Sequence, residues 1–161
     1  MSNSMDFIIS YFLTHSLTIS CAESCTGGLV SDKLIQRSGA SKYFKGSVVA
    51  YSKAVKQSFL SVSDLLIEEK GIISAEVAMA MAVSCKENFS TDWALSSTGF
   101  AESTIIGGKT QKPIVYIGVV GPNVEETLVC KFDKESRNQV RQQSVIRAFD
   151  FLSECIKNKT K

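Results

Sequence analysis

The sequence predicts an α/β protein, a three-layer α/β/α sandwich around a mixed sheet, in a single domain that spans residues 1–161. Three observations lead to this prediction. Short apolar runs alternate with helical patterns early in the chain. Two strand-like runs later flank a turn of Gly, Pro and Asn. Hydrophobic residues make up 44% and charged residues 21% of the chain, which is typical of a globular protein large enough for a full core.

The first elements alternate between helix and strand. Residues 5–15 fit a helix, and residues 17–21 fit a short buried strand that runs into the small and polar segment 22–28. A second helix is expected to open at Thr26, Gly27 and Gly28 and to continue to Gln36, with Gly39 as its stop.

Serines in N-cap positions mark the next two helices. The expected elements are a strand at 47–51, a helix from its cap Ser52 to Leu60, a helix from its cap Ser74 to Asn88, a strand at 93–98, a hairpin of strands 113–121 and 126–132, a helix at 135–155 and a polar tail at 157–161.

Three segments follow the carboxyl ends of predicted strands. These are residues 22–28, 51–56 and 98–108. Ligands of open α/β sheets bind beyond the carboxyl ends of the strands. The sequence therefore predicts that the functional site is formed by these segments.

Charge and hydropathy exclude several functional classes. With 18 basic and 16 acidic residues, the net charge of +2 is too small for a dedicated nucleic-acid binder. No apolar run reaches the roughly 18 residues of a membrane span. The apolar stretch near the N-terminus has no basic region before it and no cleavage pattern after it, so a signal peptide is not expected and the protein is expected to be cytoplasmic.

A metal site is not expected either. The five cysteines form no C-x-x-C pair, and His15 is the sole histidine, so we predict buried free thiols. Residues 103–110 are one glycine short of a P-loop and are soon followed by Pro113, which favours a strand where a P-loop needs a helix. The glycosylation patterns at Asn88 and Asn158 are expected to be chance matches in a cytoplasmic protein.

The segment 22–28 is the most informative motif. A serine at a strand-to-helix turn, here Ser24, can present its hydroxyl while the following amide groups point at a developing oxyanion. The alternative is a turn with an N-cap serine and tightly packed glycines. A nucleophilic serine needs a base, and because His15 is expected in the first helix, a lysine is the remaining candidate.

Two basic positions complete the candidate set. Lys56 lies between Val55 and Phe59 at a strand end, where burial would lower its pKa and allow it to accept a proton, although a surface lysine is the simpler interpretation. Arg141 is expected on the apolar side of the last helix with Arg137 one turn earlier. Either arginine could pair with a carboxylate of the protein or hold a phosphate or carboxylate of a ligand.

The chain resembles the C-terminal domain of the CinA competence/damage-inducible family, whose characterised members are nicotinamide mononucleotide (NMN) deamidases. The matching stretches are A-E-S-C-T-G-G at 22–28, V-V-A-Y-S at 48–52 followed by Lys56, G-I-I-S-A-E-V-A at 71–78, S-T-G-F-A at 97–101 and K-P at 112–113.

The resemblance implies a stand-alone deamidase domain with no metal or redox cofactor, and suggests a homo-oligomer. It implies hydrolysis of NMN to nicotinate mononucleotide and ammonia by a Ser-Lys dyad, in pyridine nucleotide recycling. Ser24 would be the nucleophile and Lys56 the general base, with amides at Cys25 to Gly27 binding the oxyanion. The substrate-binding residues would be Glu23, Cys25, Thr26, Gly27, Tyr51, Thr98, Gly99, Arg137 and Arg141.

Three departures from the family pattern suggest a second hypothesis. Glu102 and Ser103 stand where the family has a Gly-Pro step, which places a carboxylate beside the expected phosphate position. Glu135 replaces a glycine before Arg137, and Lys53 replaces a frequent asparagine. The alternatives are therefore a CinA-like binding protein without NMN turnover, or an amidase of a related carboxamide.

Overall fold

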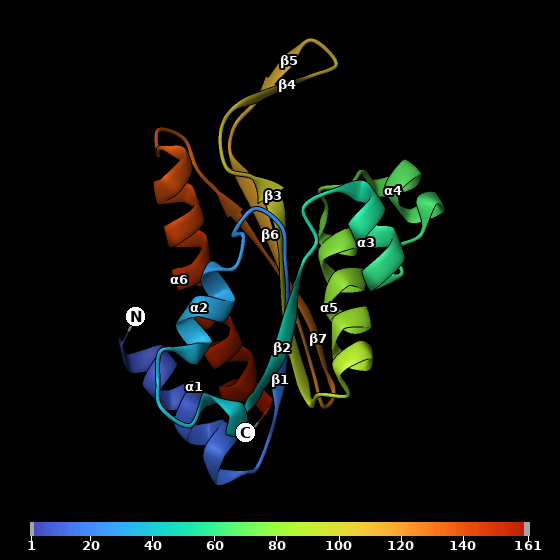
Figure 1. Ribbon diagram of the computed structural model, residues 1–161. Helices are drawn as coiled ribbons and strands as arrows, with labels where there is room; N and C mark the ends of the chain where they lie inside the picture. The colour runs from blue at the N-terminus through green and yellow to red at the C-terminus, as the bar shows by residue number, and fades with distance from the viewer. Residues whose placement is uncertain (1, 160–161) are drawn as a thin grey trace.

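A five-stranded mixed sheet separates two helical layers in the computed structural model, which describes residues 2–159 (Figure 1). The strand order is β2-β1-β3-β6-β7, in which β2, β1 and β3 are parallel while β6 and β7 are antiparallel to their neighbours. The strands are β1 Ile19–Glu23, β2 Phe44–Val49, β3 Trp93–Phe100, β6 Ile114–Gly121 and β7 Val124–Lys131. This architecture confirms the predicted fold class.

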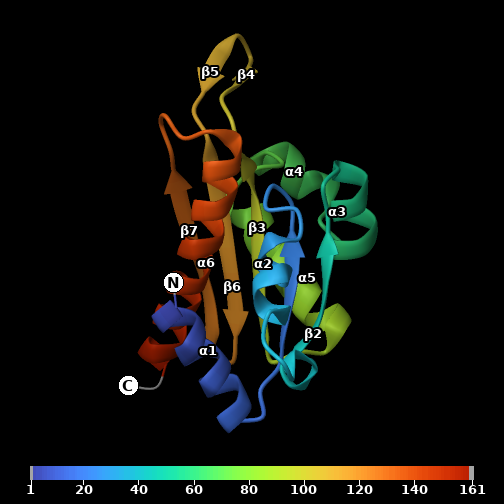
Figure 2. The same cartoon turned by 60° about the vertical axis from the view of Figure 1, so that its left-hand side comes forward.

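Helices cover both faces of the sheet. On one face lie α1, α2 and α6, and on the other lie α3, α4 and α5 (Figures 1 and 2). The helices are α1 Ser2–Thr14, α2 Leu29–Ile35, the 3-10 helix η1 Ala40–Lys42, α3 Lys53–Leu60, α4 Asp64–Lys70, α5 Ala75–Phe89 and α6 Arg137–Lys159.

Each face of the sheet has its own apolar core. The core beneath α1, α2 and α6 includes Phe12, Trp93 and Phe149, and the core beneath α3 to α5 includes Leu60 and Met81. Because β1 is central and covered on both faces, all five of its residues are buried.

The carboxyl ends of β1, β2 and β3 lie at the same edge of the sheet because these strands run parallel. The segments that follow them therefore meet, as the sequence analysis predicted. Side-chain caps fix two of the neighbouring helices: Ser52 Oγ accepts from Val55 N at 3.3 Å and Ser74 Oγ accepts from Val77 N at 3.2 Å. Both caps were predicted.

A small hairpin projects beyond this edge of the sheet (Figures 1 and 2). It consists of β4 Thr104–Ile106 and β5 Lys109–Gln111, joined by a two-residue glycine turn. The sequence analysis expected only a loop here, although two glycines between short apolar and β-branched runs are a hairpin signal. No helix follows the turn, which confirms that residues 103–110 are not a P-loop.

Several predicted boundaries were wrong. The first two strands lie two or three residues away from the expected 17–21 and 47–51, because their limits are set by pairing with neighbouring strands. The helix expected at 26–36 begins only at Leu29, and Gly39 precedes η1 and does not end α2.

Two further elements differ from expectation. The helix α4, capped by Ser63, was not predicted, although a serine followed by Asp64 and an apolar pair is a helix-start signal. The last helix extends to Lys159, so residues 157–159 of the expected polar tail are helical, while residues 160 and 161 lie outside the described residues.

The five cysteines are all buried and free, as predicted. Burial is the main cause that raises the pKa of each thiol, to about 12 for Cys25 and to about 11 for Cys85 and Cys155. Within residues 2–159, no helix has both the length and the apolar character needed to cross a membrane.

Candidate functional site

A cavity of about 350 Å³ opens at the carboxyl edge of β1, β2 and β3. Its lining combines the predicted strand-end segments with the loop before α5 and the first residue of α6. The lining residues are Ser24, Cys25, Tyr51, Lys56, Ile72, Ile73, residues 98–104 and Arg137. The predicted residues Ser24, Cys25, Tyr51, Lys56, Thr98, Gly99 and Arg137 are therefore brought together.

Ser24 follows β1 directly and lines the cavity. Its amide donates to the carbonyl oxygen of Ser97 at 2.9 Å, and its own carbonyl accepts from Gly27 N at 3.1 Å. The residue is 8% exposed, so its hydroxyl is reached only through the cavity. The serine is thus held at a tight turn in the wall of the cavity.

The buried Glu23 carboxylate stabilises this turn by hydrogen bonds. It accepts five hydrogen bonds, from Thr26 Oγ1 at 2.7 Å, Gly28 N at 2.9 Å, Val30 N at 3.1 Å, Ser31 N at 2.9 Å and Ser31 Oγ at 2.6 Å. The amide groups at the start of α2 are therefore occupied by a carboxylate. These amides, of Gly28, Val30 and Ser31, are therefore not free for an oxyanion, and among the expected donors at Cys25 to Gly27, Gly27 N already donates to Ser24 O.

Thr26, Gly27 and Arg141 also support the turn and do not line the cavity. Thr26 Oγ1 lies 2.6 Å from Ser97 Oγ. Arg141 donates from Nε to Cys25 O at 3.1 Å and from Nη2 to Thr26 O at 3.0 Å. Gly27 has φ of +58°, a left-handed conformation that favours glycine, and a Cβ there would lie 3.3 Å from Arg141 Nη2.

Lys56 is buried in the first turn of α3, with 2% exposure. Its Nζ donates to the carbonyl oxygen of Ala50 at 2.7 Å. Burial lowers the pKa of the Lys56 amine to about 8, and the electrostatic effect of Cys25 opposes this only in part. The interpretation as a surface lysine was wrong, and a large fraction of this amine is neutral near pH 8.

Cys25 lies beside Ser24 in the cavity lining and is the other candidate nucleophile. Burial raises the pKa of its thiol to about 12, so the thiolate is scarce at neutral pH. Since the thiolate and not the thiol is nucleophilic, burial does not activate Cys25.

Thr98 and Gly99 form the wall contributed by β3. The Thr98 hydroxyl is fully buried and has no hydrogen-bond partner among the described residues. A Cβ on Gly99 would collide with the carbonyl oxygen of Ile114, which explains why glycine stands here. Ile72 and Ile73 add an apolar wall that the sequence analysis missed, although both lie in the matching stretch 71–78.

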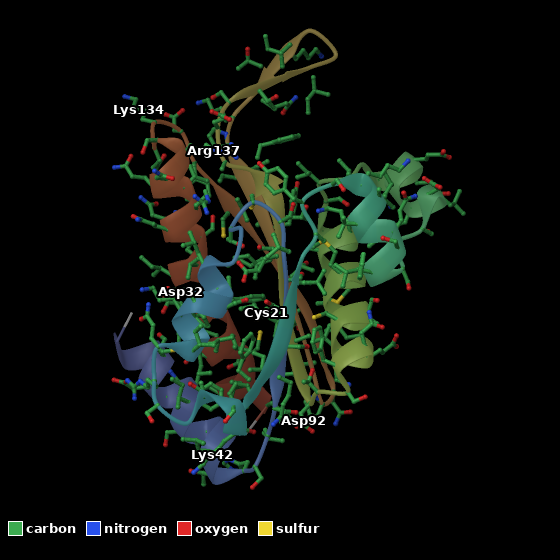
Figure 3. The ribbon with its side chains drawn as sticks, in the orientation of Figure 1. Cys21, Asp32, Lys42, Asp92, Lys134 and Arg137 are labelled. Carbon is green, nitrogen blue, oxygen red and sulfur yellow. The ribbon has the colours of Figure 1, made fainter. Side chains whose placement is uncertain are left out.

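The mouth of the cavity is spanned by a chain of three side chains, which we call the mouth triad. Arg137 donates from Nη1 to Glu102 Oε1 at 2.8 Å and from Nη2 to Tyr51 Oη at 2.8 Å. Figure 3 shows Arg137 at the end of the molecule from which the β4–β5 hairpin projects, with Asp92 at the other end. Glu102 therefore lies beside Arg137, one of the two arginines expected to hold a phosphate.

The sole histidine plays no part in this site. His15 follows α1 at the amino end of β1, is exposed, and its Nδ1 lies 2.8 Å from Tyr11 O. Residues 2–159 contain no group of three or more His, Cys, Asp and Glu side chains that could hold a metal ion. A serine-histidine pair is therefore not available at the cavity.

The fold and the site define an α/β/α sandwich protein whose strand-end cavity is lined by both a serine on a tight turn and a desolvated lysine. The sequence model of the CinA C-terminal domain matches residues 2–156, and the chain belongs to this family.

Relatives and solved structures agree with this assignment. CinA-like proteins of Prochlorococcus marinus and Dictyoglomus thermophilum are 44% and 41% identical over 80% and 91% of this chain, covering 30% and 36% of their own lengths. The chain thus spans about a third of the length of these relatives. A competence/damage inducible protein from Agrobacterium tumefaciens has 27% identity and a TM-score of 0.81, with 93% of this chain and 92% of that chain covered. A competence damage-inducible protein from Klebsiella pneumoniae, at 20% identity and 96% coverage of both chains, shares the fold with a TM-score of 0.89.

Proposed function

We propose that this chain is an amidohydrolase that converts NMN to nicotinate mononucleotide and ammonia, by a Ser24-Lys56 dyad. The single observation that carries the proposal is the presence, in one cavity, of a serine on a tight turn and a lysine whose pKa is lowered to about 8. A hydroxyl becomes nucleophilic when a neighbouring base removes its proton, and a neutral buried lysine is such a base.

The first half of the reaction forms an acyl-enzyme. Lys56 takes the proton of the Ser24 hydroxyl as Oγ attacks the carboxamide carbon. The amide groups of Cys25 and Thr26 stabilise the oxyanion, since Gly27 N already donates to Ser24 O. Lys56 then gives its proton to the departing nitrogen, and ammonia leaves.

The second half releases the acid. Water attacks the ester carbon with Lys56 again as the base, and nicotinate mononucleotide leaves as Ser24 regains its proton. The neutral Lys56 amine donates to Ala50 O, which leaves its lone pair for the proton transfer.

The decisive experiment measures ammonia release from NMN by the purified protein, with chromatographic detection of nicotinate mononucleotide. Ser24→Ala is expected to abolish both products, while Ser58→Ala, an exposed serine of α3, is expected to leave them unchanged. Equal turnover by the wild-type protein and Ser24→Ala would contradict the proposal.

A second candidate is a CinA-like binding protein without NMN turnover. The ion pair between Arg137 and Glu102 favours this candidate, because Glu102 occupies the guanidinium of Arg137 at the cavity. NMN would then raise the melting temperature without forming product. An amidase of a related carboxamide would instead release ammonia from other carboxamides only.

A further inference from the structure

The mouth triad joins segments that are far apart in the chain. Tyr51 follows β2, Glu102 follows β3, and Arg137 begins α6. Both bonds of the triad are made by the Arg137 guanidinium, one to the carboxylate and one to the phenol oxygen. An anionic ligand at the mouth would need the same Arg137 N–H groups that now donate to Glu102 and Tyr51.

Charge is unevenly distributed in the cavity. Among the described lining residues, Lys56 and Arg137 are basic, and Glu102 is the single carboxylate. Lys56 lies deep beneath the mouth, whereas Arg137 and Glu102 are 43% and 64% exposed at the rim. The balance of charge at the rim therefore depends on the Glu102 side chain.

An anion can displace Glu102 from Arg137, because exposed ion pairs are weak. The displaced carboxylate nevertheless stays close, since Glu102 directly follows the buried Ala101 and its backbone is tied to the end of β3. A bound phosphate would therefore compete with this carboxylate for Arg137 and then lie near a like charge.

We propose that Glu102 is a specificity-determining residue that weakens recognition of a phosphate group at Arg137 and so narrows the preference for phosphorylated over unphosphorylated carboxamides. The inference rests on the proposed function, in which the phosphate is the anionic end of the substrate. An unphosphorylated carboxamide such as nicotinamide riboside does not face this competition.

Calorimetric titration with ribose 5-phosphate tests the inference independently of turnover, with ribose as the neutral probe. Glu102→Gln is expected to bind ribose 5-phosphate about 3- to 10-fold more tightly than the wild-type protein, with no change for ribose. Glu102→Asp, which keeps the charge, should remain within about 2-fold of wild type. Glu125→Gln removes an exposed carboxylate at the start of β7, on the opposite edge of the sheet, and should have no effect.

A double-mutant cycle with Arg137→Gln checks the partner, because the gain from Glu102→Gln should disappear in that background. Unchanged affinity of Glu102→Gln for ribose 5-phosphate, or no binding by that variant at millimolar concentration, would overturn the inference. If the gain is found but NMN is never hydrolysed, the proposed function fails and the role of Glu102 stands. If NMN is hydrolysed, Glu102→Gln should raise kcat/KM for NMN relative to nicotinamide riboside.

Discussion

The turn that carries Ser24 and the mouth triad lie at the same cavity but are built in different ways. The turn is fixed by a buried carboxylate with five hydrogen bonds and by Arg141 from the last helix. The mouth is held by two bonds of one exposed arginine. The difference indicates that the position of Ser24 is set by folding, whereas the contacts at the mouth can change without loss of the fold.

The largest expected effect is on catalysis, at Lys56. Lys56→Met is expected to lower ammonia release from NMN by about 10²- to 10⁴-fold, because the proton acceptor is lost. In the proposed mechanism the neutral amine is the active form, so kcat/KM of the wild-type protein should rise as pH rises through about 8 and level off above it. A pH–rate series for both proteins checks this, and a profile flat between pH 7 and 9 would remove Lys56 as the base.

The stability of Lys56→Met shows whether lost activity is due to unfolding of this variant. The folded-state pKa of Lys56, about 8, lies below the ordinary lysine pKa of 10.5, so the unfolded chain binds more protons between these pH values. The free energy of unfolding of the wild-type protein therefore gains a contribution as pH rises from about 8 to 10.5, of about 3 kcal/mol at most. Lys56→Met should be more stable than wild type at pH 7, and this advantage should shrink above pH 8.

The next effect is on the stability of the turn. Glu23→Ala removes the acceptor of five hydrogen bonds and leaves buried amide groups unpaired, so the free energy of unfolding should fall by about 3 kcal/mol or more. Glu23→Gln keeps one acceptor oxygen and should lose about 1–2 kcal/mol. Urea denaturation measures both variants.

The exposed Glu87 of α5 provides the matched control for Glu23. Glu87→Ala is expected to stay within about 0.5 kcal/mol of wild type. A loss below about 1 kcal/mol in Glu23→Ala would show that the turn does not depend on this carboxylate.

The smallest effect is expected at the mouth. Tyr51→Phe deletes the acceptor of one Arg137 bond, and since both side chains are largely exposed, the free energy of unfolding should change by less than about 0.5 kcal/mol. Urea denaturation beside the Glu23 variants gives the comparison directly. A loss above about 1.5 kcal/mol in Tyr51→Phe would erase the contrast between the two regions.

Local signals in the sequence predicted much of the fold and most of the residues that line the cavity. The caps at Ser52 and Ser74 depend on bonds three residues apart, which a sequence pattern contains. The meeting of segments 22–28, 51–56 and 98–108 follows from parallel strands, whose carboxyl ends share an edge.

The features that sequence reasoning missed depend on distant partners. Glu23 was expected to contact the substrate, but its neighbours in the fold are the amides of its own turn and helix. Arg141 was expected to meet a carboxylate or a ligand, yet it donates to carbonyl oxygens 115 and 116 residues away. The delayed start of α2 has the same origin, because the Glu23 carboxylate and Gly27 shape the turn before Leu29.

The distribution of the buried thiols has a consequence for how unfolding can be followed. Cys85 lies in the core beneath α3 to α5, while Cys21, Cys25, Cys130 and Cys155 lie in the core beneath α1, α2 and α6. Cys25 also lines the cavity, but an alkylating reagent meets the other four side chains only when the layer that covers them opens. The order in which the other four sulfur atoms are alkylated in urea therefore records which helical layer leaves the sheet first.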